Sequence, residues 1–359
     1  MGAISELFDR TVLVVPCYRE AASAGTTDII GRNIEIMPLS VPAGKGLARK
    51  LLFPVWLIRN ALKIFTEIWR ADAVHAVIPG DVGTIGMAAA LIMRKPLFVR
   101  HCGNWSVHAT TSERLWRWAM ERFAGGRNVM FATGGSDGLP SARNRHIEWI
   151  FSTSLSRDAI RHGSARSLNQ PRSMKLITAC RLEEKKGVET VIRCLPLLLE
   201  QFPDATLSIV GDGTLRPSLE RTVQSLGLRD RVHFHGRVSQ TAVMNLMRSS
   251  DVFCFPTSAS EGFPKVVLEA LSCGLPIVTT KVSVLPHLLK DKCGSLLNEP
   301  TEEALAEAIR AIAGDPERYR NMSSAALAVA AKYSLEDWRE LIGERLRRAW
   351  NVNSLASQP

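Results

Sequence analysis

The second half of the chain alternates short apolar runs with helical patterns, and this alternation constrains the fold more than any other feature. The apolar runs are typical of strands: "KLITAC" (175–180), "TLSIVG" (206–211), "VHFHG" (232–236), "VFCFP" (252–256) and "PIVTT" (276–280). Helical stretches such as "PSLERTVQSLG" and "SQTAVMNLMRSS" separate them. Apolar strands that alternate with helices predict a parallel sheet buried on both faces.

The first half shows the same rhythm less regularly. Its expected strands are 11–16, 33–39, 73–79, 97–101 and 129–134, and a long helix is expected at about 47–71. The polar segment "SARSLNQPRSM" (164–174) lacks an apolar period and is the expected seam between two α/β layers. A final helix is expected over 334–350, with Ser334 as its N-cap and Asp337 in its first turn.

Length and cysteine usage favour a cytoplasmic protein with two domains. A chain of 359 residues exceeds one ordinary domain. Its seven cysteines include no C-x-x-C pair, which favours reduced thiols over a disulfide framework or a zinc site. The start "MGAISELFDR" lacks the basic and apolar parts of a signal peptide, and no apolar run is long enough to span a membrane.

Positive charge is concentrated in the first half, where residues 1–165 hold 20 Lys and Arg against 13 Asp and Glu. Such a balance attracts anions. Cations lie among aromatic and aliphatic residues in 45–65 and in 112–123. These segments could contact an anionic membrane at the inner face of the plasma membrane. Ordinary amphipathic helices whose lysines extend to water are the alternative.

Glycines and cations follow the expected strands of the second half. In chain order these segments are 181–187, with Arg181 and a Lys pair; "GDG" (211–213); "GRV" (236–238); and "TSASE" (257–261). Each segment alone is common in turns and on surfaces. Because parallel strands place their carboxyl ends at one edge of a sheet, together they suggest a site for a diphosphate.

The stretch "EGFPKVVLEALSCGLP" (261–276) places one acid ahead of a helix and another inside it. We expect Pro264 at the first helical position, with Glu261 in the preceding loop and Glu269 in the helix. The free N–H groups of the first turn would bind an anion, and the two carboxylates would accept hydrogen bonds from hydroxyls on either side of it. A nucleoside diphosphate sugar has this layout, although two surface glutamates remain the alternative.

These residues also carry a family resemblance. "SEGFPKVVLEALSCGLPIV" resembles the Glu-x7-Glu signature of retaining glycosyltransferases of family 4, and "CRLEEKKG" resembles their Arg-x4-Lys-Gly element. "IVGDG", "HFHGRV" and "YSLEDW" follow in the order that the family shows, so the resemblance covers about 171–350.

The resemblance implies a GT-B fold, in which two Rossmann-like parallel-sheet domains face each other across a cleft and a C-terminal helix crosses back. The implied domains are an acceptor-binding domain at 1–165, a nucleotide-sugar-binding domain at 171–335, and a helix and tail at 336–359 that return toward the first domain. The implied reaction is retaining sugar transfer to a glycan or lipid-linked acceptor in bacterial surface or exopolysaccharide synthesis, without a metal or a cofactor.

Site residues also follow from the resemblance. Those implied to carry the transfer are Glu261, Arg181, Lys186 and His101. Those implied to bind the donor are Gly211, Arg237, Val238, Gly262, Phe263, Pro264, Val266, Val267 and Glu269. In this family the departing phosphate is held to take the acceptor's proton, so that no side-chain nucleophile is required.

The sequence departs from the family pattern in two places. The loop after the first strand, 17–28, has only Gly25 where the family has a glycine-rich turn, and His287 stands where the family often has a glutamate. A nucleotide-sugar epimerase with a GT-B fold and a non-catalytic homologue are the alternatives. Nucleic-acid binding would fit the basic charge, but the chain has no RNP-like or helix-turn-helix signature, so we expect no nucleic-acid partner.

Overall fold

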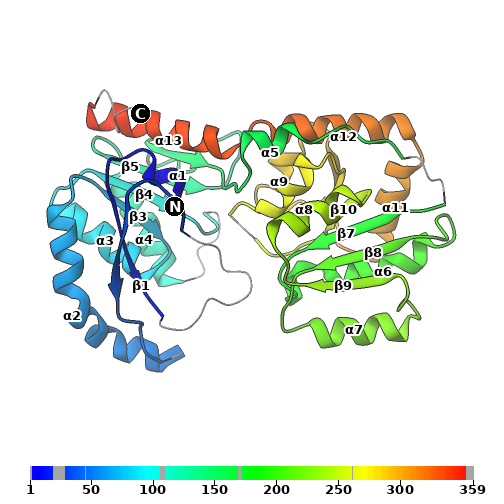
Figure 1. Cartoon of the computed structure of the whole chain (residues 1–359), viewed down its shortest axis with the longest axis horizontal. Coiled ribbons are helices and arrows are strands. Elements are labelled where there is room, and N and C mark those ends of the chain that lie inside the picture. The colour runs from blue at the N-terminus through cyan, green and yellow to red at the C-terminus, as the bar shows by residue number, and fades with distance from the viewer. Residues whose placement is uncertain are drawn as a thin grey trace. The chain divides into compact units, whose positions relative to one another are not determined.

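The computed structural model describes residues 2–18, 29–44, 46–105, 110–168, 172–260 and 262–352. The chain divides into two compact units (Figure 1). The first comprises Met1–Ile150 with Trp338–Pro359, and the second comprises Phe151–Asp337. Each unit is described by itself below.

The second unit is built on a six-stranded parallel sheet in the order β12-β11-β10-β7-β8-β9. Its strands are β7 (Lys175–Ala179), β8 (Thr206–Val210), β9 (Val232–Gly236), β10 (Val252–Phe255), β11 (Ile277–Thr280) and β12 (Gly294–Leu297). The sequence predicts all but β12, whose four residues begin with glycine and show no β-branched run. The order reverses between β7 and β10, which makes this pair the topological switch point of a doubly wound sheet.

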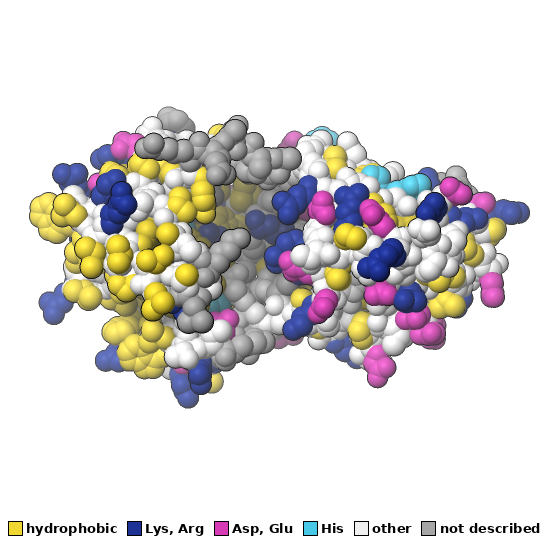
Figure 2. Space-filling model, turned by 90° about the horizontal axis from the view of Figure 1, so that it is seen from below, with side chains coloured by type: hydrophobic (Ala, Val, Ile, Leu, Met, Phe, Trp, Pro, Cys, Tyr) yellow, Lys and Arg dark blue, Asp and Glu magenta, His cyan; other side chains and the backbone are white. Residues whose placement is uncertain are grey.

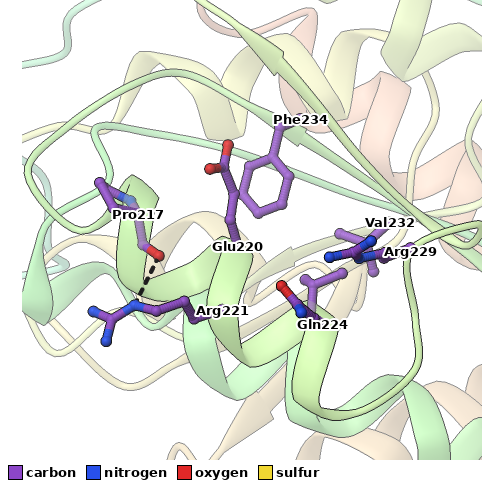
Figure 3. Close-up of a pocket in the computed structure, with 8 residues that line it drawn as sticks. Pro217, Glu220, Arg221, Gln224, Arg229, Val232 and Phe234 are labelled. Atoms are coloured by element: carbon purple, nitrogen blue, oxygen red, sulfur yellow. Dashed lines mark hydrogen bonds between the residues drawn. The ribbon is translucent and has the colours of Figure 1, made fainter.

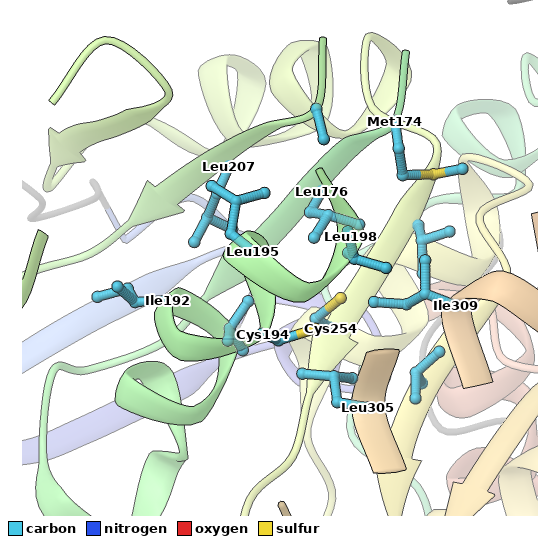
Figure 4. Packing of buried hydrophobic residues seen from close by; sticks show 14 of the residues in the cluster. Met174, Leu176, Ile192, Cys194, Leu195, Leu198, Leu207, Cys254, Leu305 and Ile309 are labelled. Carbon is cyan, nitrogen blue, oxygen red and sulfur yellow. The ribbon is translucent and has the colours of Figure 1, made fainter. Parts of the chain in front are cut away.

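Helices cover both faces of this sheet. They are α5 (Arg157–Arg161), the 3-10 turn η1 (Glu184–Lys186), α6 (Val188–Leu198), α7 (Arg216–Ser225), α8 (Gln240–Arg248), α9 (Lys265–Ser272), α10 (Leu285–Leu289), α11 (Glu302–Ala313) and α12 (Pro316–Ala330). Successive strand residues point to opposite faces. Leu176 therefore joins the core beneath α6 and α11 (Figure 4), whereas Ile177 joins the core with α8 and α9. The predicted burial of this sheet on both faces is confirmed.

The first unit has two parallel sheets. One pairs β1 (Thr11–Pro16) with β2 (Ile34–Leu39). The other runs in the order β3-β4-β5-β6, with β3 (Val74–Ile78), β4 (Leu97–His101), β5 (Asn128–Thr133) and β6 (Ile147–Ile150). Its helices are α1 (Gly2–Ser5), α2 (Gly46–Arg70), α3 (Asp81–Ile92) and α4 (Thr111–Phe123).

The last helix, α13 (Leu335–Trp350), returns to the first unit, as the family resemblance implies. Its start is capped as expected, because the Asp337 N–H donates to Ser334 Oγ at 3.0 Å. Further along, Arg345 Nε donates to the Glu148 carboxylate at 2.8 Å, and the Trp350 indole N–H donates to the Arg127 carbonyl at 2.9 Å.

The two passages of the chain between the units lie beside each other. The Leu335 N–H donates to the Leu155 carbonyl at 2.8 Å, and the Arg157 N–H donates to Glu336 Oε2 at 2.8 Å. The chain enters the second unit after Ile150, which is ahead of the polar segment 164–174 where the sequence suggests the seam. In agreement, Leu155 is already buried in the second unit's core.

The loops that follow β7 and β8 interlock through glycines. Gly211 has φ +120°, and a Cβ at this position would lie 1.9 Å from the Cys180 carbonyl oxygen. A Cβ on Gly213 would lie 2.4 Å from the Leu182 carbonyl oxygen, and the Leu182 N–H in turn donates to the Asp212 carbonyl. These glycines therefore allow two loops to approach each other, which is a structural role beyond close approach to a ligand.

None of the helices in the described ranges is long and apolar enough to cross a membrane.

We expect Gly211→Ala to lower the free energy of unfolding by about 3 kcal/mol, because the added methyl meets backbone and the left-handed φ is unfavourable. Gly227→Ala is the matched control: Gly227 has φ +68°, but no atom lies within 4 Å of an added Cβ. The control should lose only about 1 kcal/mol. Urea denaturation compares the two, and equal losses would contradict the interlock.

Candidate functional site

The candidate site lies where the loops after β7 and β10 are joined at the switch point. The Lys185 carbonyl accepts hydrogen bonds from the Ser258 N–H at 2.9 Å, the Ala259 N–H at 3.1 Å and Thr257 Oγ1 at 2.9 Å. Thr257 is itself buried, with 1% exposure. These bonds hold the Lys186 turn beside the segment that leads into α9.

Lys186 ends the turn η1 and is only 5% exposed. Burial lowers the pKa of its amine below the ordinary value of 10.5, and the nearby positive charge of Arg181 lowers that pKa further. Gly187 follows with φ +71°, and a Cβ there would meet the Pro256 carbonyl oxygen at 2.2 Å. Because water screens a buried amine less than an exposed one, its charge would act strongly on an anion bound beside this loop.

Arg181 differs from Lys186 because its side chain is 73% exposed. Its Nη1 donates to Glu183 Oε1 at 3.0 Å. An exposed ion pair of this kind contributes little to stability, so the guanidinium can exchange Glu183 for a phosphate at small cost.

Helix α9 begins one residue later than the sequence predicts. Pro264 is the N-cap, with φ −79° and ψ 101°, and Lys265 is the first helical residue. The extended ψ of Pro264 keeps it outside the helix, and Pro264, which has no polar side-chain atom, supplies no cap to the first turn. The Val267 N–H donates to the Pro264 carbonyl at 3.1 Å, so a phosphate at this amide would share or replace that bond. The Lys265 side chain is exposed, and Val266 is half-buried.

The segment before α9 is held by aromatic packing. Phe263 is 8% exposed, and its ring lies 6.3 Å from that of Phe151 and 5.7 Å from that of Tyr333. This contact fixes the backbone of Gly262 and Pro264 on either side. Glu261 lies outside the described residues.

Glu269 is half-buried in α9, and its carboxylate is oriented by two partners. Ser154 Oγ donates to Glu269 Oε1 at 3.0 Å, and Gln240 Nε2 donates to the same oxygen at 2.8 Å. Gln240 also donates to Ser154 Oγ at 2.9 Å. Ser154 and Gln240 were not expected from the sequence, because they are far from Glu269 in the chain. Their positions are the one feature that the sequence offers: Ser154 lies just ahead of α5, and Gln240 is the first residue of α8.

Arg237 and Val238 follow β9 and precede α8. Arg237 is exposed, whereas Val238 packs against the core that contains α9. Gly211 is joined to this segment, because its N–H donates to the Gly236 carbonyl at 2.8 Å. The structure therefore brings Gly211 and the 236–238 segment together, as a common binding surface requires.

His101 belongs to the first unit, where it ends β4 and is 5% exposed. Its ring meets Trp105 edge-on, with centroids 5.3 Å apart and an interplanar angle of 81°. His287 is half-buried in α10 of the second unit. Residues 19–28 of the atypical first loop lie outside the described ranges.

An open groove of about 530 Å³ lies elsewhere, between α7 and β9 (Figure 3). Glu220, Arg221 and Phe234 are among the residues that line it. None of the site residues expected from the sequence contributes to it, and the carboxyl ends of the parallel strands are the stronger candidate on physical grounds. Within the described ranges, no group of three His, Cys, Asp or Glu side chains could hold a metal ion.

We expect Arg181→Ala to raise the pKa of Lys186 toward 10.5, because the substitution removes a neighbouring positive charge. NMR of ¹³C-labelled lysine measures this pKa, and Lys186→Arg assigns the signal. Arg193→Ala, at an exposed arginine paired with Glu189, is the control and should leave the Lys186 signal in place. The folded state releases the Lys186 proton at a lower pH than the unfolded state does, so stability should rise with pH between the two pKa values. An unchanged titration in Arg181→Ala would contradict the coupling.

Comparison with known proteins gives this site a context. Residues 164–329 match the family model for glycosyl transferases of group 1. The chain is 32% identical over 167 residues to phosphatidyl-myo-inositol mannosyltransferase of Mycobacterium leprae, a match that covers 46% of this chain and 43% of that protein. It is 30% identical over 192 residues to GDP-mannose-dependent monoacylated alpha-(1-6)-phosphatidylinositol monomannoside mannosyltransferase of Corynebacterium glutamicum, a match that covers 51% and 48%. The chain thus spans less than half the length of each of these relatives.

The fold is similar to that of solved structures over nearly the whole chain. The crystal structure of Anabaena HepE in complex with UDP and glucose has a TM-score of 0.66 at 20% identity, covering 88% of this chain and 86% of that chain. The GT-B fold expected from the resemblance is thereby confirmed. The chain has the GT-B fold, and its residues 164–329 match the group 1 glycosyltransferases.

Proposed function

We propose that the protein is a retaining, metal-independent glycosyltransferase of family 4 with the Glu-x7-Glu motif. It moves a sugar from a nucleoside diphosphate sugar to a glycan or lipid-linked acceptor, in bacterial surface or exopolysaccharide synthesis. The observation that carries this proposal is the switch point, where the Lys185 carbonyl holds the buried Lys186 beside the loop that leads into α9. A cation, a helix N-terminus and an oriented carboxylate there match a sugar diphosphate.

In this proposal Lys186 and Arg181 bind the diphosphate and stabilise the negative charge that grows on it as the sugar departs. The effect is strongest for Lys186, because its burial reduces screening by water. Glu269 accepts hydrogen bonds from the ribose hydroxyls, and Glu261 accepts them from the transferred sugar. His101 lies near the reacting sugar.

The remaining donor contacts involve mostly backbone. The amides of Val266 and Val267 meet phosphate, and the backbone of 262–264 meets the transferred sugar. Gly211, Arg237 and Val238 border the base. The acceptor attacks the face from which the nucleotide leaves, and a departing phosphate oxygen takes its proton.

The proposed division of labour follows the domains. The first unit, expected from the sequence at 1–165, binds the acceptor; the second, expected at 171–335, binds the nucleotide sugar; and 336–359 return to the first. In support, HepE was solved with UDP and glucose, and both relatives are named as mannosyltransferases of phosphatidylinositol-type substrates.

We also propose a cytoplasmic location at the inner face of the plasma membrane, with peripheral contact through 45–65 and 112–123 and no nucleic-acid partner. All seven cysteines are free, which fits a reducing compartment.

A thermal-shift screen of nucleotide sugars, followed by a transfer assay with the stabilising donor, tests the proposal. A ligand that binds only the folded chain raises the melting temperature. Retention is read from the anomeric configuration of the product by NMR. Conversion of free nucleotide sugars without transfer to any acceptor would indicate an epimerase and overturn the proposal.

We expect Lys186→Ala and Glu261→Ala each to reduce kcat/KM by at least about 100-fold, because each removes a group that stabilises the transition state. The control is Lys185→Ala, which removes an exposed neighbouring amine but keeps the backbone carbonyl that joins the loops. Its kcat/KM should stay within a few-fold of the unsubstituted protein. Comparable activity in Lys186→Ala and Lys185→Ala would remove Lys186 from the mechanism.

Ser154→Ala combined with Gln240→Leu should raise the donor KM about tenfold and leave kcat nearly unchanged. These residues act through Glu269, so their loss frees its carboxylate to rotate and weakens ground-state and transition-state binding equally. Thr241→Ala, at an exposed position next to Gln240, is the control. A loss of kcat at unchanged KM would show that the pair does more than position Glu269.

A further inference from the structure

Helix α2 presents a continuous apolar stripe to solvent. Leu51, Val55, Ile58, Leu62 and Trp69 are between 64% and 80% exposed. They recur at spacings of three, four and seven residues, so at about 100° per residue they lie within roughly 40° of one line along the helix. Phe65, with 39% exposure, falls on the same line. Single exposed apolar residues need no explanation, but a stripe of this length on one helix does.

The opposite face of α2 already accounts for packing within the unit. Trp56, Ile64 and Ile68 are at most 6% exposed and form a core with Ala89 of α3. The Trp56 indole N–H donates to the Ser40 carbonyl at 2.6 Å. The helix is therefore fixed by one face, and the apolar stripe on the other face is not required by the fold.

Charge on α2 indicates what covers the stripe. Lys50, Arg59, Lys63 and Arg70 are exposed, and Glu67 is the only acid in the helix. Arg59, Lys63 and Arg70 lie about 80° to 120° from the stripe, at its border. Hydrophobic side chains with basic residues among them gather on one face of the first unit (Figure 2). An apolar stripe with a basic border complements a bilayer with anionic headgroups, whereas a second copy would bring like charges together.

We propose that α2 lies in the plane of an anionic bilayer surface. Its stripe enters the acyl region, and its flanking cations meet the lipid phosphates. The inference sharpens the proposed peripheral contact by assigning it to α2 rather than α4. On α4, only Leu115 and Trp118 are exposed among the large apolar residues, at 56% and 55%. Of the proposed function, this inference depends only on the peripheral membrane contact, because lipid binding does not require sugar transfer.

Co-sedimentation with vesicles tests the assignment. The vesicles are phosphatidylcholine alone, or phosphatidylcholine with about a third phosphatidylglycerol. The α2 variant is Ile58→Asp with Leu62→Asp, and the matched α4 variant is Leu115→Asp with Trp118→Asp. Circular dichroism and the melting temperature establish that each variant is folded.

The full chain should bind the anionic vesicles, and the α2 variant should lose at least about tenfold in affinity because two apolar side chains no longer enter the acyl region. The α4 variant should lose less than about threefold. High salt should weaken binding but not abolish it, since the apolar contribution is not screened.

Three results would overturn the inference: equal binding by the full chain and the α2 variant, loss confined to the α4 variant, or dimerisation through α2 without vesicle binding. Dimerisation is read by analytical ultracentrifugation. If the α2 double variant does not fold, quenching of Trp fluorescence by brominated lipid tests the assignment in its place. Quenching should fall in Trp69→Phe relative to Trp118→Phe, and equal quenching would count against α2.

Discussion

The candidate site depends on one carbonyl group. Because Lys185 O accepts bonds from Thr257, Ser258 and Ala259, two loops that are far apart in the chain hold a common geometry. The strand order makes this possible, since β7 and β10 are neighbours at the point where the strand order reverses. The bonds use backbone almost entirely, so the geometry survives changes in most neighbouring side chains, while the buried amine of Lys186 supplies the charge.

The side chains of the site differ in how many contacts hold them in place. Glu269 is oriented by Ser154 and Gln240, and Phe263 is fixed by aromatic contacts. Arg181, in contrast, is exposed and pairs with Glu183 at the surface. A site whose backbone is held by hydrogen bonds and whose one exposed cation has a weak surface partner can accept a charged ligand without first breaking its own framework.

Much of this arrangement could be predicted from the sequence. Strands with strong β-branched runs can be located to within a residue or so at each end, since the apolar pattern and the length of the run both indicate a strand. The weak cases have physical causes: β12 begins with glycine and has no β-branched run, and Pro264 has an extended ψ that excludes it from α9. Ser154 and Gln240 could not be found, because hydrogen bonds between distant side chains leave no local pattern. The glycines of the β8 loop stand out in the sequence, but their interlock with the β7 loop becomes visible only in three dimensions.

The second unit is inserted between two parts of the first, and the hydrogen bond from Leu335 to Leu155 brings its ends together. A segment with adjacent ends can be replaced by another of similar end spacing without stretching the chain that receives it. The same property suits this unit to expression by itself or to insertion into another protein. Evolution could thus exchange one half of such a protein as a module while the other half kept its own sheet and its closing helix.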